Sequence, residues 1–167
     1  MKREKIVIVD DNDNIIYSKY RDEVDYYNDI RRSSGIWITN SNEQVLIAQR
    51  SFKKKIDAGK WGPAVQGSIG IDETYDSNAN KEIEEELGIK DAKLIKYKKQ
   101  YVDYPMKYFS QWYLYKTDLT ISDFTFPKDE VENIKWIDKS DLILDIKNNP
   151  NNYIPCMLEI FYFLEKK

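Results

Sequence analysis

The sequence contains no histidine and a single cysteine, Cys156. The lack of histidine excludes Ser-His-Asp and Cys-His catalysis, zinc sites with histidine ligands, and haem held by histidine. One cysteine can form neither a disulfide within the chain nor a cysteine-rich zinc site, and the apolar residues around Cys156 predict inert packing. A catalytic metal would therefore need mainly oxygen ligands, which favours Mg²⁺ or Mn²⁺.

A strong charge of one sign and long apolar runs are also lacking. The chain has 26 Lys and Arg residues against 29 Asp and Glu residues, so its formal net charge is −3. This charge is too small to indicate binding to nucleic acid or anionic membranes. No stretch approaches the ~20 apolar residues of a membrane span, and the apolar run after the basic residues 1–5 is too short for a signal peptide. We therefore expect a cytoplasmic protein that binds neither nucleic acid nor membranes.

The 167 residues fit one domain, which we expect to cover residues 1–167. Apolar runs bounded by turn residues predict strands, and longer periodic segments predict helices. The expected strands are 5–9, 15–20, 35–39, 44–49, part of 66–71, 94–102, 108–115 and 131–137, and the expected helices are 75–87, 141–146 and 154–164. Residues 21–31 are predicted to form a short helix or a loop. This order predicts an α+β fold or an α/β/α sandwich around a mixed sheet.

The predicted helix 75–87 has clear ends and a clear apolar face. Thr74 is a suitable N-cap, and Gly88 stands where a left-handed residue ends many helices. Ala79, Ile83 and Leu87 share a face suited to core packing.

Three carboxylates gather beside that apolar face. At about 100° per residue, Glu82, Glu85 and Glu86 fall within roughly 100° of one another. Like charges at this spacing disfavour a helix by a few tenths of a kcal/mol per pair, and a hard divalent cation would offset the repulsion. Taken alone, such a run is more often a solvated acidic face than a metal site.

The residues that flank this run favour the metal-binding interpretation. Gly67 is followed by Glu73, and then by the segment 81–89, which reads Lys-Glu-Ile-Glu-Glu-Glu-Leu-Gly-Ile. The pattern resembles the signature of the Nudix hydrolase family, a glycine and a glutamate followed by Arg-Glu-U-x-Glu-Glu-x-Gly-U, where U is aliphatic. Every fixed position in this Nudix box, residues 67–89, matches except that Lys81 replaces arginine. The similarity extends over about residues 5–165.

The resemblance implies a Nudix-type α/β/α sandwich with a mixed sheet, and it implies roles for the box. Glu82, Glu85 and Glu86, with the carbonyl group of Gly67, would ligate Mg²⁺ or Mn²⁺, which would bridge a small-molecule diphosphate substrate and activate a water for attack on phosphorus. We favour Glu85 or Glu86 as the base, and Glu130 is a weaker candidate.

Further residues take supporting roles by the same resemblance. Glu73 normally pairs with the arginine of the box, and Lys81 keeps the charge but not the bidentate geometry. Arg50 is expected near the substrate phosphates, and Glu130 near the substrate. Relatives are often dimers, so a homodimer is one candidate assembly.

The chain also resembles the isopentenyl-diphosphate isomerase-like branch of the family. In the isomerases proper, a catalytic cysteine and a histidine flank the equivalent of Gly67, but here Gln66 and Ser68 stand in those positions. We therefore predict a hydrolase of a nucleoside diphosphate derivative or related compound. A catalytically weak module that binds a nucleotide or diphosphate is the main alternative because of Lys81, and an isomerase ranks below it.

Aromatic residues are the remaining candidates for substrate contacts. Tyr101, Tyr104, Tyr108 and Trp112 could stack against a base or an apolar group, although an aromatic strand face more often belongs to the core. Trp61 is likewise predicted to pack in the core or a loop rather than to stack on a substrate.

Overall fold

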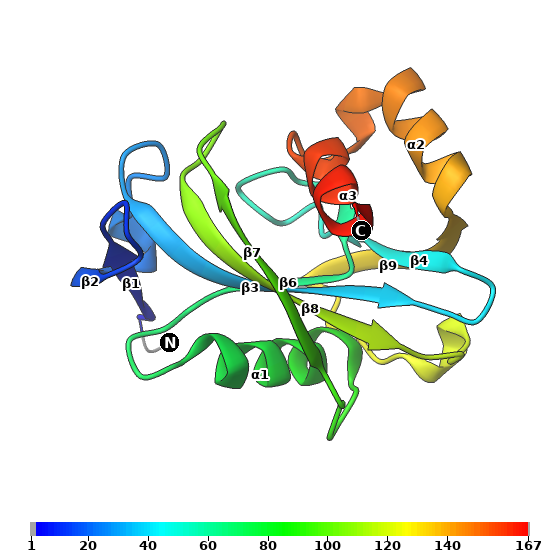
Figure 1. Ribbon diagram of the computed structural model, residues 1–167, viewed down its shortest axis with the longest axis horizontal. Helices are drawn as coiled ribbons and strands as arrows, with labels where there is room; N and C mark the ends of the chain where they lie inside the picture. The colour runs from blue at the N-terminus through cyan, green and yellow to red at the C-terminus, as the bar shows by residue number, and fades with distance from the viewer. Residues whose placement is uncertain (1–2, 167) are drawn as a thin grey trace.

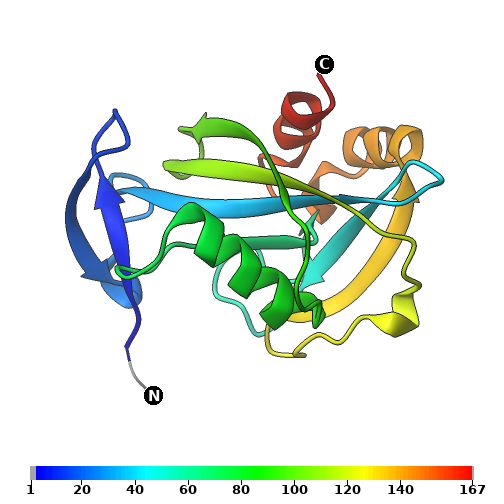
Figure 2. The same cartoon turned by 60° about the horizontal axis from the view of Figure 1, so that its bottom comes forward.

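The computed structural model describes residues 3–166, so residues 1, 2 and 167 of the predicted domain lie outside it. Within the described part, the strands form one nine-stranded sheet. Helix α1 (Tyr75–Leu87) covers one face, and α2 (Lys139–Asn148) and α3 (Met157–Glu165) lie on the other (Figure 2). Strands β3 (Ile30–Thr39) and β8 (Tyr108–Lys116) pair in parallel, while the other pairs are antiparallel. The predicted α/β/α sandwich around a mixed sheet is confirmed.

Strand β3 organises the sheet because both of its edges are paired. Strand β8 occupies one edge from Arg31 to Thr39. The other edge is shared in turn by three strands, β1 (Lys5–Val9), β6 (Val65–Ser68) and β4 (Gln44–Arg50). Because β6 pairs with Ser33–Ile36 and β4 pairs with β3 only at Thr39, these two strands diverge from a common edge.

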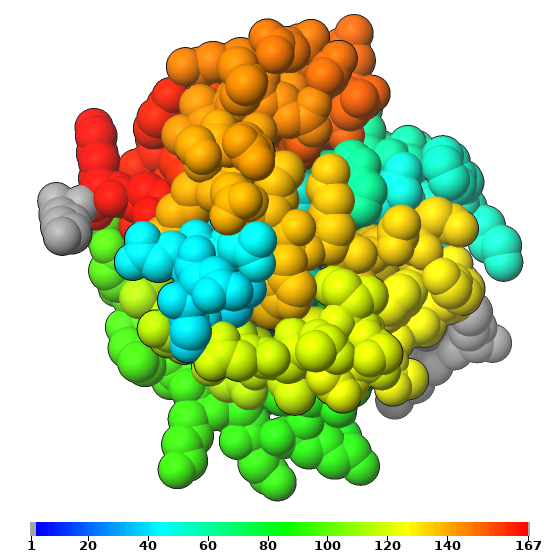
Figure 3. Space-filling view, turned by 90° about the vertical axis from the view of Figure 1, so that its right-hand side faces the viewer, coloured from blue at the N-terminus to red at the C-terminus, as the bar shows by residue number. Residues whose placement is uncertain are grey.

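The outer strands extend this frame at both ends. Strand β2 (Ile15–Tyr20) forms a hairpin with β1 at one end of the molecule, opposite α2 (Figure 1). Strands β5 (Trp61–Pro63) and β9 (Val131–Asp138) flank β4, and β7 (Ile95–Val102) pairs with β8. The turn between β3 and β4 lies beside the segment that follows β8 (Figure 3), where the Ser41 hydroxyl donates to Asp118 at 2.7 Å.

Helix α1 begins and ends where its sequence predicts. The Thr74 hydroxyl accepts a hydrogen bond from the Ser77 backbone N–H at 3.1 Å, and Gly88 has a left-handed φ of 72°. Ala79, Ile83 and Leu87 are buried in a core cluster between α1 and the sheet. The predicted helix ends and apolar face are confirmed.

Other boundaries differ from the prediction for physical reasons. Strand β3 begins at Ile30, five residues before the predicted start at 35, because β1 and β8 pair with its first residues. The predicted helix or loop over 21–31 contains only the short 3₁₀ helix Arg21–Glu23. Helix α3 begins at Met157 rather than at 154, since Pro155 disfavours a helical residue before it.

No described helix is long and apolar enough to cross a membrane. The two faces of the sheet pack against separate core clusters. Trp112 is fully buried in the cluster that α2 and α3 cover, as predicted for an aromatic strand face, and Tyr108 is also buried. Tyr101 and Tyr104 are exposed, so the prediction of a core position is wrong for these two rings. Trp61 is half-buried and packs against the second cluster.

Asp13 fixes the β1–β2 hairpin to the rest of the molecule. It lies in the turn with φ of 63°, and its carboxylate accepts hydrogen bonds from Arg32 Nε at 2.7 Å, Lys99 Nζ at 2.5 Å and the Tyr75 hydroxyl at 3.0 Å. Burial raises the pKa of the Asp13 carboxyl, but hydrogen bonds from Lys99, Arg32 and Tyr75 outweigh it and hold this pKa below its ordinary value. The residue therefore joins the turn to β3, β7 and α1.

Replacement of Asp13 by Asn should destabilise the fold. Asn tolerates a left-handed turn, so the substitution removes mainly the charged hydrogen bonds, and we expect a loss of about 2 kcal/mol at neutral pH. The folded-state pKa is lowered, so this stabilisation is present above the unfolded pKa of about 3.9. It is lost as the pH falls through the folded-state pKa.

Urea unfolding of the wild type and D13N should therefore show a difference in unfolding free energy at neutral pH that shrinks as the pH falls below the unfolded pKa of about 3.9. Asp11→Asn is the matched control, because Asp11 is exposed in the same turn. Equal losses in both variants would contradict this account of Asp13.

Candidate active site

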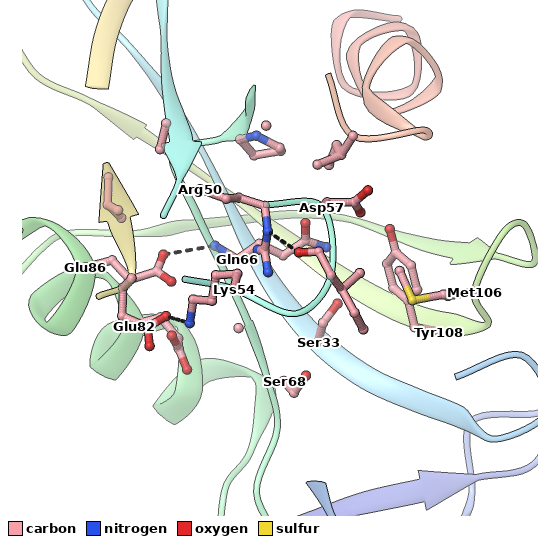
Figure 4. Close-up of a pocket in the computed structure, with 18 of the residues that line it drawn as sticks. Ser33, Arg50, Lys54, Asp57, Gln66, Ser68, Glu82, Glu86, Met106 and Tyr108 are labelled. Atoms are coloured by element: carbon pink, nitrogen blue, oxygen red, sulfur yellow. Dashed lines mark hydrogen bonds and ion pairs between the residues drawn. The ribbon is translucent and has the colours of Figure 1, made fainter. Parts of the chain in front are cut away.

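A cavity of about 460 Å³ lies where α1, the free side of β6, the loop after β4 and the start of β8 come together. Of the eight predicted site residues, all but Glu73 line it. Figure 4 shows Glu82 and Glu86 at one end and Tyr108 and Met106 at the other, with Gln66 between them. The structure thus brings the box and the distant Arg50 and Glu130 into one cavity.

Gly67 allows α1 to approach β6 closely. A Cβ atom at position 67 would overlap the carboxyl group of Glu82. Its φ lies outside the left-handed region, so the requirement for glycine here is steric rather than conformational. The empty side-chain position lets the carboxylate of Glu82, which is 9% exposed, lie directly against the strand.

Asn78 holds Glu82 in that position. Its side-chain N–H groups donate to Glu82 Oε1 at 3.2 Å, Glu73 Oε2 at 2.9 Å and the Ser68 carbonyl at 3.2 Å. Its own oxygen accepts a hydrogen bond from the Ser34 hydroxyl. This fully buried amide therefore ties α1 to β3, to β6 and to both halves of the box.

Two of the three box carboxyls on α1 lie in an environment that disfavours their charge. Burial raises the pKa of Glu82 to about 7, opposed by Lys81 and reinforced by Glu85. Burial and the charge of Glu82 raise the pKa of Glu86 well above its ordinary value, although Glu86 accepts a hydrogen bond from the Gln66 N–H at 3.3 Å. A cation beside these groups would remove the repulsion.

Glu73 and Lys81 connect the loop of the box to its helix, as the resemblance implies. Lys81 Nζ lies 2.9 Å from Glu73 Oε1, while the other oxygen of Glu73 accepts the Gly70 N–H at 2.8 Å. Burial raises the pKa of the Glu73 carboxyl, but the hydrogen bonds from Gly70, Lys81 and Asn78 outweigh it and lower this pKa. One lysine donor thus makes the contact, with no bidentate pairing.

Arg50 and Glu130 line the cavity where the paired strands β4 and β9 meet it. Arg50 Nε donates to the Ile56 carbonyl at 3.2 Å, which fixes the basic loop over the cavity, and Glu130 pairs with Lys54. Both charges act on the Glu86 carboxyl, Glu130 raising its pKa and Arg50 lowering it. Lys54, which the sequence interpretation did not single out, brings a further cation into the cavity.

The donor set suits a hard divalent cation, although the side chains are not gathered around one point. Within residues 3–166, no three Asp, Glu, Cys or His side chains are grouped so that they could hold a metal ion. Glu82 and Glu86 instead accept hydrogen bonds from Asn78 and Gln66. Their charge, their burial and the cavity beside them fit Mg²⁺ or Mn²⁺ by chemistry. The carboxylate side chains would need to rotate to converge on an ion.

Sequence reasoning missed Asn78 and Lys54. A signal for Asn78 exists, because it is polar, sits beside Ala79 on the core side of α1 and precedes Glu82 by one helical turn. Lys54 is one of several basic residues in its loop, and nothing local sets it apart. Cys156 also lines the cavity, where burial raises the pKa of its thiol, in agreement with inert packing.

Replacing Gly67 by Ala should displace Glu82 and lower the free energy of unfolding by about 1–3 kcal/mol. Thermal or urea unfolding measures this loss. Gly62→Ala is the control, because Gly62 lines the same cavity and its added methyl would meet the Ile154 side chain, whose nearest atom, Cδ1, lies at 3.2 Å. A G67A variant as stable as G62A would show that Glu82 does not need the empty position.

Known proteins share both the sequence and the fold. An uncharacterised Nudix hydrolase of Pseudomonas aeruginosa is 33% identical over 102 residues, which cover 61% of this chain and 60% of that protein. The isopentenyl-diphosphate Δ-isomerase of Serratia proteamaculans is 31% identical over 85 residues, covering 51% of this chain and 48% of the isomerase. Each match spans less than two thirds of the relative's own length.

The likeness in structure covers almost the whole chain. The crystal structure of DR0079 from Deinococcus radiodurans aligns with a TM-score of 0.87 over 98% of this chain and 100% of that one. The identity is 18%, so this likeness concerns the fold. The NUDIX domain model matches residues 29–156, a range that contains the complete box and the strands around it. The chain therefore belongs to the Nudix family.

Proposed function

We propose that this protein is a pyrophosphohydrolase that hydrolyses a diphosphate linkage in a nucleoside diphosphate derivative or a related compound, with a divalent metal ion. Members of the Nudix hydrolase family act on such compounds and typically use divalent metals. The observation that carries the proposal is the cavity that box carboxylates on α1 line together with two cations, Arg50 and Lys54. An acidic end suits the metal, and the cations suit the phosphates.

The residues of the chain have distinct tasks in this proposal. Glu82, Glu85 and Glu86, with the Gly67 carbonyl, would hold Mg²⁺ or Mn²⁺. When bound, such an ion neutralises charge on the diphosphate and lowers the pKa of a water molecule. Arg50 and Lys54 orient the phosphate oxygens, since cations placed where charge develops lower the barrier.

The base is a box carboxylate in this account. Glu85 is exposed and lines the cavity, whereas Glu86 is half-buried and accepts the Gln66 N–H. Either can take a proton from the attacking water. Glu130 is a weaker candidate because its carboxylate already pairs with Lys54.

The two alternatives make different predictions. A binding module would need the same cavity but no turnover, and the single-donor contact of Lys81 is the feature that favours it. An isomerase needs an acid and a base for proton transfer at carbon. Gln66 and Ser68 line the cavity at the positions of the isomerase cysteine and histidine, and neither side chain suits those tasks.

The direct test is turnover against nucleoside diphosphate derivatives, dinucleoside polyphosphates, NADH, sugar nucleotides and isopentenyl diphosphate, with and without Mg²⁺ or Mn²⁺. We expect metal-dependent release of a phosphomonoester, reduced about a hundredfold or more in Glu85→Gln, Glu86→Gln and the double variant.

Glu84→Gln is the matched control. Glu84 lies on the same helix but is exposed outside the cavity, 3.9 Å from Lys90, so its loss should leave turnover unchanged. A lack of turnover on every compound, with metal still raising the melting temperature of the wild type alone, would replace the hydrolase by the binding module.

A further inference from the structure

Arg31 is a buried cation in the wall of the cavity. It lies near the start of β3, it is 8% exposed, and it lines the cavity together with Tyr26 and Tyr108. Tyr108 marks the end of the cavity away from Glu82 and Glu86 (Figure 4). The guanidinium therefore lies at the opposite end from the box carboxylates.

No described carboxylate neutralises this charge. Among residues 3–166, Arg31 makes one side-chain hydrogen bond, from Nη1 to the Ser68 hydroxyl at 3.4 Å, and its buried Nε has no partner. The carbon of the guanidinium lies 4.5 Å from the ring centre of Tyr26 and 5.5 Å from that of Tyr108. Such cation–π contacts hold the group in place without using its N–H donors.

The neighbouring arginine shows how this fold treats a structural guanidinium. Arg32 points to the other face of the sheet, where its Nε lies 2.7 Å from an Asp13 oxygen. A buried charge without a partner costs stability, and an apolar side chain could fill the place of Arg31 against the two tyrosines. An unpaired arginine at this place is therefore best explained by an anion that binds there.

The position relative to the box defines where such an anion would lie. Ser68, which Arg31 contacts, directly follows Gly67, and Gly67 contacts Glu82. Side chains of neighbouring strand residues point to opposite faces, so Arg31 and Glu82 approach β6 from opposite sides. A phosphate held by Arg31 would thus lie in the same cavity as a diphosphate bound at the acidic end, but away from the box carboxylates.

We propose that Arg31 binds a terminal phosphate group of the substrate, so that the preferred substrates carry a free phosphate beyond the linkage that is cut. The free donors of a guanidinium form a fork that fits phosphate oxygens. This inference rests on the proposed function for its substrate, but the anion site itself does not depend on catalysis.

Binding of inorganic phosphate tests the site without metal or turnover. Calorimetric titration of the wild type in metal-free buffer should detect phosphate, and Arg31→Gln should weaken its binding about tenfold to a hundredfold. Arg31→Lys keeps the charge but not the forked donors, so its phosphate affinity should lie between those of the wild type and Arg31→Gln. Arg3→Gln is the control for net charge, because Arg3 is exposed and lies outside the cavity.

Kinetics identify the source of the phosphate. On a substrate with a free terminal phosphate, R31Q should raise KM with little change in kcat, as expected for lost ground-state binding. On the analogue whose terminal phosphate is esterified, R31Q and the wild type should have the same KM. An equal KM change on both compounds would overturn the terminal-phosphate assignment.

The two proposals fail in different ways. Unchanged phosphate affinity in R31Q, or no phosphate binding by the wild type, would overturn the anion site even if metal-dependent turnover is found. Phosphate binding that depends on Arg31 without turnover of any compound would leave the anion site standing and refute the hydrolase. Urea unfolding of R31K and R31Q shows whether a loss of phosphate affinity is due to misfolding of the variant.

Discussion

Glu82 lies against a strand position that carries no side chain, and the arrangement of the site depends on this contact. Gly67 lets α1 approach β6, and Asn78 then ties the carboxylate of Glu82 to Glu73 and to the Ser68 carbonyl. These contacts set the distance between α1 and the sheet and the rotation of α1 about its own axis. With α1 fixed in this way, Glu85 and Glu86 line the cavity.

The cavity has charge of opposite sign at its two ends. At the acidic end, on α1, burial is the main cause that raises the pKa of Glu82 and of Glu86. At the other end Arg31 is buried beside two tyrosines, and no carboxylate in the described part of the chain pairs with it. An elongated anion bound with a cation would neutralise both ends. Among the described residues, Asp29 is the buried charge outside the cavity, and it is paired with Lys19, so the imbalance is concentrated where a ligand can enter.

Local sequence signals were enough for α1 and for most strands. The cap at Thr74, the left-handed Gly88 and the apolar face are properties of one segment, and the structure reproduces them. The spacing of the box also located the acidic end of the cavity. The first half of β3 was missed because its partners, β1 and β8, are distant in sequence. Asp13 and Arg31 were missed for the same reason, since their roles arise only from neighbours that long-range pairing supplies.

The central claim is that the glutamates of α1 hold a divalent cation. Direct titration with Mn²⁺, followed by calorimetry or by loss of the free-ion paramagnetic signal, tests it without any assumption about the substrate. The account predicts saturable binding to the wild type and strongly weakened binding when Glu82 and Glu86 are both replaced by Gln, while the fold stays intact. Equal Mn²⁺ affinity in the two proteins would contradict it.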